Sequence, residues 1–432
     1  MRITTIQTLF RRSAITLLIA PWLNAVSETP SPELPRNLHE YLQQGQSANP
    51  DLQVYAARYE AARERIPQAS SLPDPMLQIS HFVESVQTRT GPQKNILMLS
   101  QRLPWFGQLE GRERAADAEA EAVHYAFQAR QLLLARTIGL AFYDYAYTGK
   151  AIELTTQNLA LLEELTPQVE ERVRTGGDLN ALLRLQVEIS KLRDQLASLR
   201  EQRPRQSARL SAILALPAHA QLPWPEWMPT FDSSRASDLD THSLLASVDA
   251  NNPELLMLER KISSSQARSQ LARLERRPNF TVGLNYIQVD DPTVNPGTPD
   301  AGKDPWALTL SINLPIWNGR TSAAKREAHA NQRAAENELS YRRRQLSGSV
   351  YDSSAVLRDA QRRVVLYHDE LLPLARQALE ITRSSYEGGR ATLLEMIDSE
   401  RSLLDLELQL WRAQTDAAQQ RVVLQTLANR PL

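Results

Sequence analysis

The sequence predicts a mainly α-helical protein with a small β part, built as two tandem structural repeats. Three observations lead to this prediction. Helix-forming residues dominate, with only 15 Gly in 432 residues. A set of short motifs recurs at a nearly constant displacement along the chain. Apolar residues alternate over short segments and elsewhere recur every three or four positions, which are the periods of strands and helices.

Composition excludes several classes of function. The formal net charge is −1, so nothing in the overall charge attracts nucleic acid, and we expect no nucleic-acid partner. The chain has no Cys, which rules out disulfides, thiolate metal sites, thiol catalysis and a lipidated N-terminal cysteine. No uninterrupted apolar stretch reaches the roughly 18 residues that a membrane-spanning helix needs.

The N-terminus has the features of an export signal. A basic region that ends at Arg12 precedes an apolar run over 14–20 and the small residues Ala25-Val26-Ser27. We therefore predict a signal peptide over 1–27 and export of the mature chain from the cytoplasm.

Sliding the sequence against itself reveals the repeat. Asn49-Pro50 recurs 203 residues later as Asn252-Pro253, and Gly176 recurs 212 residues later as Gly388. The displacement increases only within one loop, over 290–304, and a chance match would not hold its displacement on both sides of that loop, so the chain contains two copies of one unit.

Each repeat is expected to contain an opening helix, a β-hairpin and long helices. We predict the first repeat over 28–216, a Pro- and Trp-rich linker or equatorial belt over 217–242, and the second repeat over 243–432. The expected hairpins cover 76–103 and 279–314, and the expected long helices cover 108–215 and 320–428.

The predicted strands alternate apolar residues with small or polar ones. In the second repeat Val282 and Leu284 share one face and Gly283 the other, and the segment from Trp306 to Leu314 alternates in the same way. Strands of about 9–10 residues with one apolar face match those that cross an outer membrane obliquely. An ordinary hairpin packed on a soluble core would show the same local pattern.

Four strands cannot close a barrel in lipid, because the open edges would leave backbone groups unpaired. Two copies would supply eight strands, whose interior is filled by side chains, whereas three would supply twelve and leave a lumen. We therefore predict that the four strands of each chain complete a 12-stranded barrel in a homotrimer.

The rest of each repeat has helical periodicity. From Leu346 to Ile381 apolar residues recur in alternating steps of four and three, with Ser353 as the only polar member, which predicts one continuous coiled-coil seam. Pro167 and Pro373 predict a kink or break. In each repeat the long helix ends at a double glycine, which lets the chain reverse into a second helix. The two helical hairpins therefore have their tips at the same end of the molecule.

The order of these elements, written twice after a signal peptide, resembles the outer-membrane efflux protein family, the TolC-like channels. The stretch from Leu372-Pro373 through Gly388-Gly389 to Leu404 is similar to the family's most recognisable segment. Similar family positions are Asn49 to Leu52, Leu72 to Pro75 and Gln101 to Gly107. The motif Pro104-Trp105-Phe106-Gly107 is reminiscent of the branches that export heavy metals.

This resemblance implies a homotrimeric channel in outer-membrane lipid, with a periplasmic helical tunnel. It would act as a passive exit duct that docks on a periplasmic adaptor, the membrane fusion protein, coupled to an inner-membrane efflux pump. The family docks through its tip turns, and the matching residues here are Arg174, Gly176, Gly177, Tyr386, Gly388 and Gly389. Heavy-metal cations are the predicted cargo, with organic toxins or a secreted protein as alternatives.

Charged residues near the tips are candidates for a tunnel gate or selectivity ring: Asp178, Arg390, Glu395 and Asp398. The alternative for each is a solvated helix face or a weak ion pair.

The sequence offers no catalytic constellation, and we expect no enzymatic activity. Gly-x-Ser-x-Gly and a phosphate-binding glycine loop are absent, and the seven His residues show no metal-ligand spacing. We therefore expect no catalytic residue, no metal and no cofactor. The alternative function is an exported periplasmic coiled-coil scaffold or adaptor, although an adaptor usually carries one helical hairpin rather than two.

Overall fold

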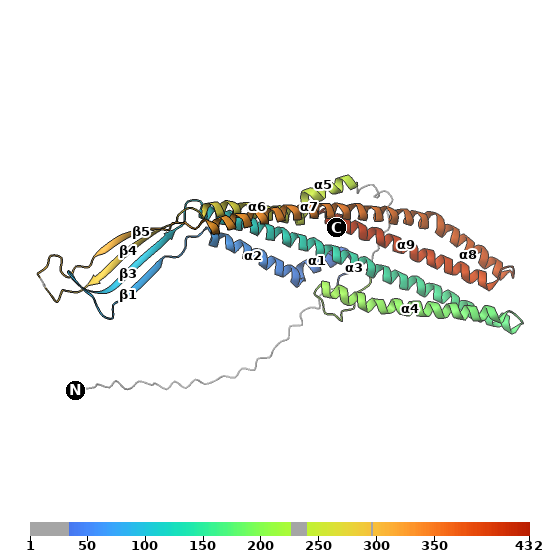
Figure 1. Ribbon diagram of the computed structural model, residues 1–432. Coiled ribbons are helices and arrows are strands. Elements are labelled where there is room, and N and C mark those ends of the chain that lie inside the picture. Colours follow the sequence, from blue (N-terminus) through green and yellow to red (C-terminus); the bar gives the residue numbers. More distant parts are fainter. Residues whose placement is uncertain (1–33, 226–239, 295–296) are drawn as a thin grey trace, which may run out of the picture. The chain divides into compact units, whose positions relative to one another are not determined.

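The computed structural model describes residues 34–225, 240–294 and 297–432. In these residues the chain is mainly helical with one small antiparallel sheet, which confirms the predicted fold class (Figure 1). The predicted signal peptide and most of the predicted linker lie outside the described residues.

Within residues 34–225 the chain forms four helices, which are α1 (Leu38–Ala48), α2 (Pro50–Ser70), α3 (Gln108–Arg174) and α4 (Leu179–Ile213). Helix α3 has 67 residues and therefore spans about 100 Å, as the apolar periodicity predicts. Pro167 lies inside α3 without ending it, so of the predicted kink or break the break does not occur, and the kink stays a prediction.

The second half follows the same order with α5 (Thr241–Asn251), α6 (Pro253–Leu274), α7 (Asn318–Val365), the π-helix η2 (Leu366–Leu371), α8 (Leu372–Glu387) and α9 (Leu393–Leu427). The sequence predicted one opening helix per repeat, whereas a short extra helix, α1 or α5, precedes each. The side chains of Asn37 and Asp240 cap these two helices, and this is the local signal that the periodicity missed.

Helix α3 connects the elements of the fold. It packs against α2, α4, α6 and α9, while α7 packs against α6 and α9 (Figure 1). Near the C-terminal end of α3, a buried core joins α3, α4 and α9 through residues that include Leu162, Leu185 and Leu404. A second core joins α5, α6, α7 and α9 around Val350 and Leu424.

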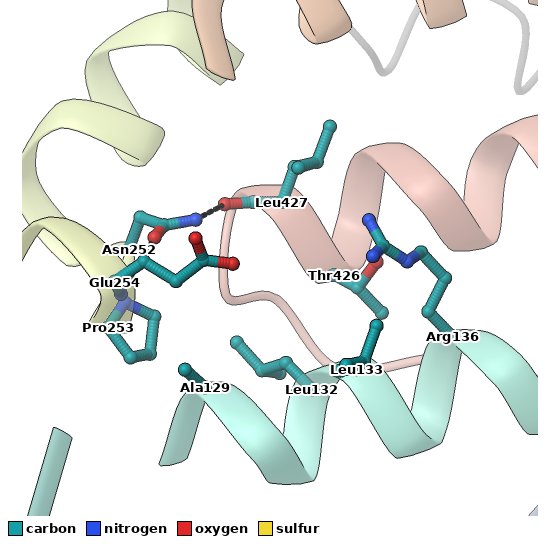
Figure 2. Close-up of a pocket in the computed structure, with 9 residues that line it drawn as sticks. All are labelled: Ala129, Leu132, Leu133, Arg136, Asn252, Pro253, Glu254, Thr426 and Leu427. Carbon is teal, nitrogen blue, oxygen red and sulfur yellow. Dashed lines mark hydrogen bonds between the residues drawn. The ribbon is translucent and has the colours of Figure 1, made fainter. Parts of the chain in front are cut away.

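The recurring Asn-Pro motif forms the same clamp in each half. The Asn252 side chain caps α6 by accepting from the Glu254 amide at 2.9 Å, and its Nδ2 donates to the Leu427 carbonyl at the end of α9, also at 2.9 Å (Figure 2). Asn49 caps α2 in the same way and donates to the Ile213 carbonyl at the end of α4. Each asparagine therefore ties the start of a helix to the end of its own half.

An ion pair repeats beside each clamp. Arg130 of α3 pairs with Asp51 of α2, and Arg342 of α7 pairs with Glu254 of α6. Both pairs are partly exposed, so each contributes modestly to stability and mainly orients one helix on the next.

The predicted continuous seam from Leu346 to Ile381 is wrong. The seam is buried through Val364, but Leu374 and Ile381 are 62% and 59% exposed. The π-helix η2 lies between Val364 and Leu374, and its wider turn inserts one residue into the helical register. Pro373 is the second residue of α8, and a π-turn just before it is one way to accommodate a residue that lacks a backbone N–H. The inward face of α8 is therefore one position later, at Leu372 and Tyr386, and the predicted seam emerges on the outside.

The sheet has the strand order β1-β3-β4-β5, with a two-residue strand β2 paired to the start of β3. Its strands are β1 (Met76–His81), β2 (Gln87–Thr88), β3 (Gly91–Leu103), β4 (Phe280–Val289) and β5 (Trp306–Ile312). The two predicted hairpins are joined edge to edge by antiparallel pairing of β3 with β4, in which Leu99 lies opposite Leu284.

The described start of the predicted linker packs on the helices rather than hanging free. The Trp224 ring stacks on Tyr145 of α3, with centroids 4.6 Å apart, and the Arg203 guanidinium lies 4.4 Å above the same ring. Tyr145 also donates its hydroxyl to the carbonyl of Leu222, which is fully buried. Residues 222–224 therefore lie against the helices, and the linker or belt over 217–242 stays a prediction.

Candidate functional site

One face of the sheet is almost entirely apolar and exposed. Because directly opposed residues of antiparallel strands share a face, the register places the alternating apolar residues of all four long strands together. The polar residue Gln101 interrupts this apolar face, and its side-chain amide donates to the Pro73 carbonyl. The residues of this apolar strand face are Leu77, Ile79, Leu97, Leu99, Leu103, Phe280, Val282, Leu284, Tyr286, Trp306, Leu308, Leu310 and Ile312.

The opposite face carries mostly small and polar side chains, such as Ser100, Thr281, Gly283 and Ser311. This division confirms the two faces that the alternation predicts. Among the described residues β1 pairs with β3 alone and β5 with β4 alone, so both outer edges of the sheet present unpaired backbone groups. A large exposed apolar face bounded by open edges is the signature of a surface that is covered by something else.

None of the helices in the described ranges is both long enough and apolar enough to cross a membrane. The same residues contain no group of three or more His, Cys, Asp or Glu side chains placed to hold a metal ion.

The first predicted tip turn is a Schellman motif at the end of α3. The Gly177 amide donates to the Arg172 carbonyl at 2.8 Å, and the Gly176 amide donates to Val173 at 3.1 Å. Gly176 has φ +100°, a left-handed conformation that favours glycine. Asp178 then caps α4 by accepting from the Asn180 amide at 2.9 Å.

The second tip turn has the same motif in a different register. The Arg390 amide donates to the Ser385 carbonyl at 2.8 Å, and the Gly389 amide donates to Tyr386 at 3.0 Å. The left-handed residue here is Gly389, with φ +70°, whereas Gly388 has φ −79° and only ends α8. The left-handed glycine is therefore the first of the pair in one turn and the second in the other.

This difference predicts unequal costs for two adjacent substitutions. Gly389→Ala should destabilise the second turn by about 1–2 kcal/mol, because alanine is strained in the left-handed region. Gly388→Ala should cost much less, since its φ is ordinary and the nearest atom to an added Cβ is the Ser384 carbonyl oxygen at 3.4 Å. Hydrogen exchange of the α8–α9 amides would measure both; equal effects would contradict the assignment.

The predicted docking residues lie in these two turns, with different exposures. Arg174 and the four glycines lie in exposed positions of the described chain. Tyr386 is only 5% exposed: it packs in the core with Leu393 and Met396, and the Arg172 guanidinium lies 4.4 Å above its ring. This cation–π contact links α3 to α8, and α8 packs on α9 in the second hairpin.

Two of the four candidate gate residues also have clear structural contacts. Asp178 is the cap of α4, and Glu395 forms a capping box with Thr392, whose amide donates to the carboxylate at 2.7 Å. Hydrogen bonds from the Thr392 amide and hydroxyl lower the pKa of Glu395. Asp398 and Arg390 are exposed, and the Asp398 carboxylate makes no hydrogen bond or ion pair among the described residues.

Glu400 is a buried titratable group near the tips that is not among the four predicted gate residues. It lies on α9, two residues after Asp398, and is only 4% exposed. Burial raises the pKa of its carboxyl, the nearby Arg383 opposes the shift, and Glu407 adds to it. A carboxylate inside an apolar helical repeat is the sequence signal that could have identified it.

The raised pKa of Glu400 predicts a pH dependence of the helical part. When the pKa of a carboxyl is higher in the folded state than in the unfolded state, the group stabilises the fold at pH values below its unfolded-state pKa. This contribution is lost as the pH rises through the pKa of the folded state. Glu400→Gln should therefore raise the unfolding free energy at neutral pH and change it little in acid. Urea unfolding at several pH values would measure this, with Asp405→Asn, an exposed change on the same helix, as the control. A variant that loses stability equally at every pH would contradict it.

The comparisons with known proteins agree with this geometry. The sequence pattern of the outer membrane efflux protein family matches residues 41–216 and 244–430. Nodulation protein T of Rhizobium leguminosarum bv. trifolii is 23% identical over 398 residues, which cover 90% of this chain and 84% of that protein. The pyoverdine export outer membrane protein OpmQ of Pseudomonas putida is 24% identical over 363 residues, 79% of this chain and 71% of that protein.

A solved structure shows that the fold is shared. The outer membrane channel MtrE of Neisseria gonorrhoeae, in its open state, matches with a TM-score of 0.74 at 18% identity, covering 91% of this chain and 89% of that one.

The fold, the apolar strand face and the matched family pattern together define a transport protein of the outer membrane, in a class of channels rather than of enzymes. The chain belongs to the outer membrane efflux protein family. It is a TolC-like protein, located in the outer membrane with its helices on the periplasmic side.

Proposed function

We propose that three copies of the chain assemble into the outer-membrane exit duct of a tripartite efflux system. The apolar strand face is the observation that carries this proposal. Its twelve exposed apolar residues are stable in lipid and costly in water. Its two open edges require partners, and in a homotrimer the β5 edge of one copy pairs with the β1 edge of the next, which closes twelve strands around a lumen.

The helices also present unpartnered apolar surfaces near the tips. On α4, Leu179, Leu183 and Val187 form an exposed stripe with helical spacing. On α8, Leu374 and Ile381 form another, left outside by the register shift at η2. Two different stripes on one chain suit a heterologous contact, in which α8 of one copy packs on α4 of the next and closes a ring.

In this assembly the duct does no chemistry. The tip turns would dock on a periplasmic adaptor, and the inner-membrane pump would supply the energy. The relative OpmQ is named for pyoverdine export, which is consistent with a small-molecule cargo. Heavy-metal cations remain our predicted cargo on the basis of Pro104-Trp105-Phe106-Gly107 alone. Metal sensitivity of a strain lacking this chain, with and without complementation, tests that prediction.

The first test of the duct is the mass of the detergent-extracted protein, measured by light scattering corrected for bound detergent. A trimer is expected. Ile381→Glu should shift the mass toward the monomer, whereas Gln202→Glu, an exposed change on α4 outside both stripes, should leave a trimer. A monomer recovered from the soluble periplasm would overturn the proposal.

Asp398 is the candidate gate residue whose carboxylate has no structural contact of its own. We expect Asp398→Ala to raise the ion conductance of the isolated channel in a planar bilayer, because a ring of carboxylates near the tip is removed. Glu395→Ala should also raise the conductance if Glu395 belongs to the gate, but it removes a capping box as well. Thr392→Ala is therefore its control, because it disrupts the same box and keeps the charge. If neither the Asp398 nor the Glu395 variant changed the conductance, these two residues would not form the gate.

A further inference from the structure

The junctions between the sheet and the helices lie beside one another. The Trp105 amide, just after β3, donates to the Asn279 side chain before β4 at 3.0 Å. The Asn313 amide, just after β5, donates to the Asn279 carbonyl at 3.2 Å. Gln108 at the start of α3 donates to the Leu274 carbonyl at the end of α6, at 3.0 Å. Three separate stretches of chain therefore form one border at this end of the sheet.

This border carries exposed aromatic rings that continue the apolar strand face. Trp105 stacks on Phe280, a member of that face, with centroids 5.6 Å apart. Phe106 and Trp317 are each 82% exposed. Aromatic side chains in such positions are typical of the level of the lipid headgroups.

The same border is cationic. Arg276, Arg277 and Arg320 are exposed, and no ion pair joins them to another residue in the described ranges. Around this border the segments 71–76, 102–114, 273–280 and 312–327 contain nine Arg or Lys and five Asp or Glu. At the far end of the sheet, the segments 81–94 and 288–305 together contain three Arg or Lys and five Asp or Glu. The sheet is thus positive at its helical end and negative at the other.

We propose that these five residues, Phe106, Arg276, Arg277, Trp317 and Arg320, form a junction collar that binds the phosphate headgroups of anionic phospholipids in the leaflet on the helical side. A guanidinium matches phosphate in charge and in hydrogen-bond geometry, and the rings insert beside the acyl chains. The collar sets which lipid surrounds the protein, in addition to any transport through it. It depends on the outer-membrane location and not on the trimer or the cargo, so a protein that conducts no ions can still show it.

The test uses the full-length chain reconstituted in phosphatidylcholine vesicles that contain phosphatidylglycerol. Tryptophan emission is quenched with brominated phosphatidylglycerol and, separately, with brominated phosphatidylcholine, and the ratio of the two reports lipid preference. We expect the natural chain to prefer phosphatidylglycerol by about fivefold or more, since one Arg near an anionic surface contributes roughly that factor. The preference should fall as salt is added.

Three variants separate the collar from general charge and from misfolding. R276Q/R277Q/R320Q should lose the preference, and R276K/R277K/R320K should retain part of it. The matched control R184Q/R200Q/R205Q removes three exposed arginines of α4 and should behave like the natural chain. The proposal is overturned if the natural chain shows no preference or if the first variant, with unchanged helix content, keeps it. It is also overturned if inorganic phosphate abolishes the preference at matched ionic strength, because the site would then be one for free anions.

Discussion

Replacing Leu308 with arginine should strongly reduce insertion of the protein into the outer membrane. Leu308 lies in β5 at the centre of one edge of the apolar strand face, opposite Leu284, and is 74% exposed. A charged side chain on the lipid side of a membrane strand costs about 2–4 kcal/mol near the bilayer midplane. The amount of full-length protein in the outer-membrane fraction, and its unfolding free energy in vesicles, should both fall.

The adjacent Ala307 provides the matched control. It is one residue away on the same strand and therefore projects from the opposite face, opposite Asn285. Ala307→Arg introduces the same charge at nearly the same depth and should leave insertion close to normal. Equal losses in the two variants would show that the apolar strand face does not meet lipid.

Asn252→Ala should give the second large effect, in the helical part. The substitution removes the cap of α6 and leaves the Leu427 carbonyl without its side-chain donor in a buried position. Losing a cap costs about 1 kcal/mol, and losing a partner for a buried polar group costs about 1–3 kcal/mol more. We therefore expect a loss of about 2–4 kcal/mol in urea unfolding followed by circular dichroism.

Two further variants divide this loss into its parts. Asn252→Ser retains a capping oxygen but cannot replace the amide donor, so it should recover about 1 kcal/mol of the loss. Asn251→Ala changes an exposed neighbour whose side chain makes no contact among the described residues and should have little effect. If Asn252→Ala were as mild as Asn251→Ala, the clamp would not stabilise the fold.

Several tip residues show why candidate sites are harder to predict than elements. The charge and position of Asp178 and Glu395 suggest a gate, yet Asp178 caps α4 and Glu395 completes the capping box of α9. The position of Tyr386 suggests a docking turn, yet its ring is buried under Arg172. Helix-terminal carboxylates and buried rings look the same in sequence as exposed functional ones, because the contacts that distinguish them come from other helices.

Local patterns in the sequence predict the fold class, the two faces of every long strand and the length of α3. Strand alternation and helical period are local properties that survive whatever the elements pack against. The sequence patterns do not predict which apolar residues of α8 face inward or which glycine of each tip turn is left-handed, because these depend on helix register and packing. One extra residue in η2 rotates the following helix by about 100°, and the left-handed position is the first glycine in one tip turn and the second in the other. Periodicity cannot detect such an insertion, because the residues on either side of it are apolar at the right spacing in both registers.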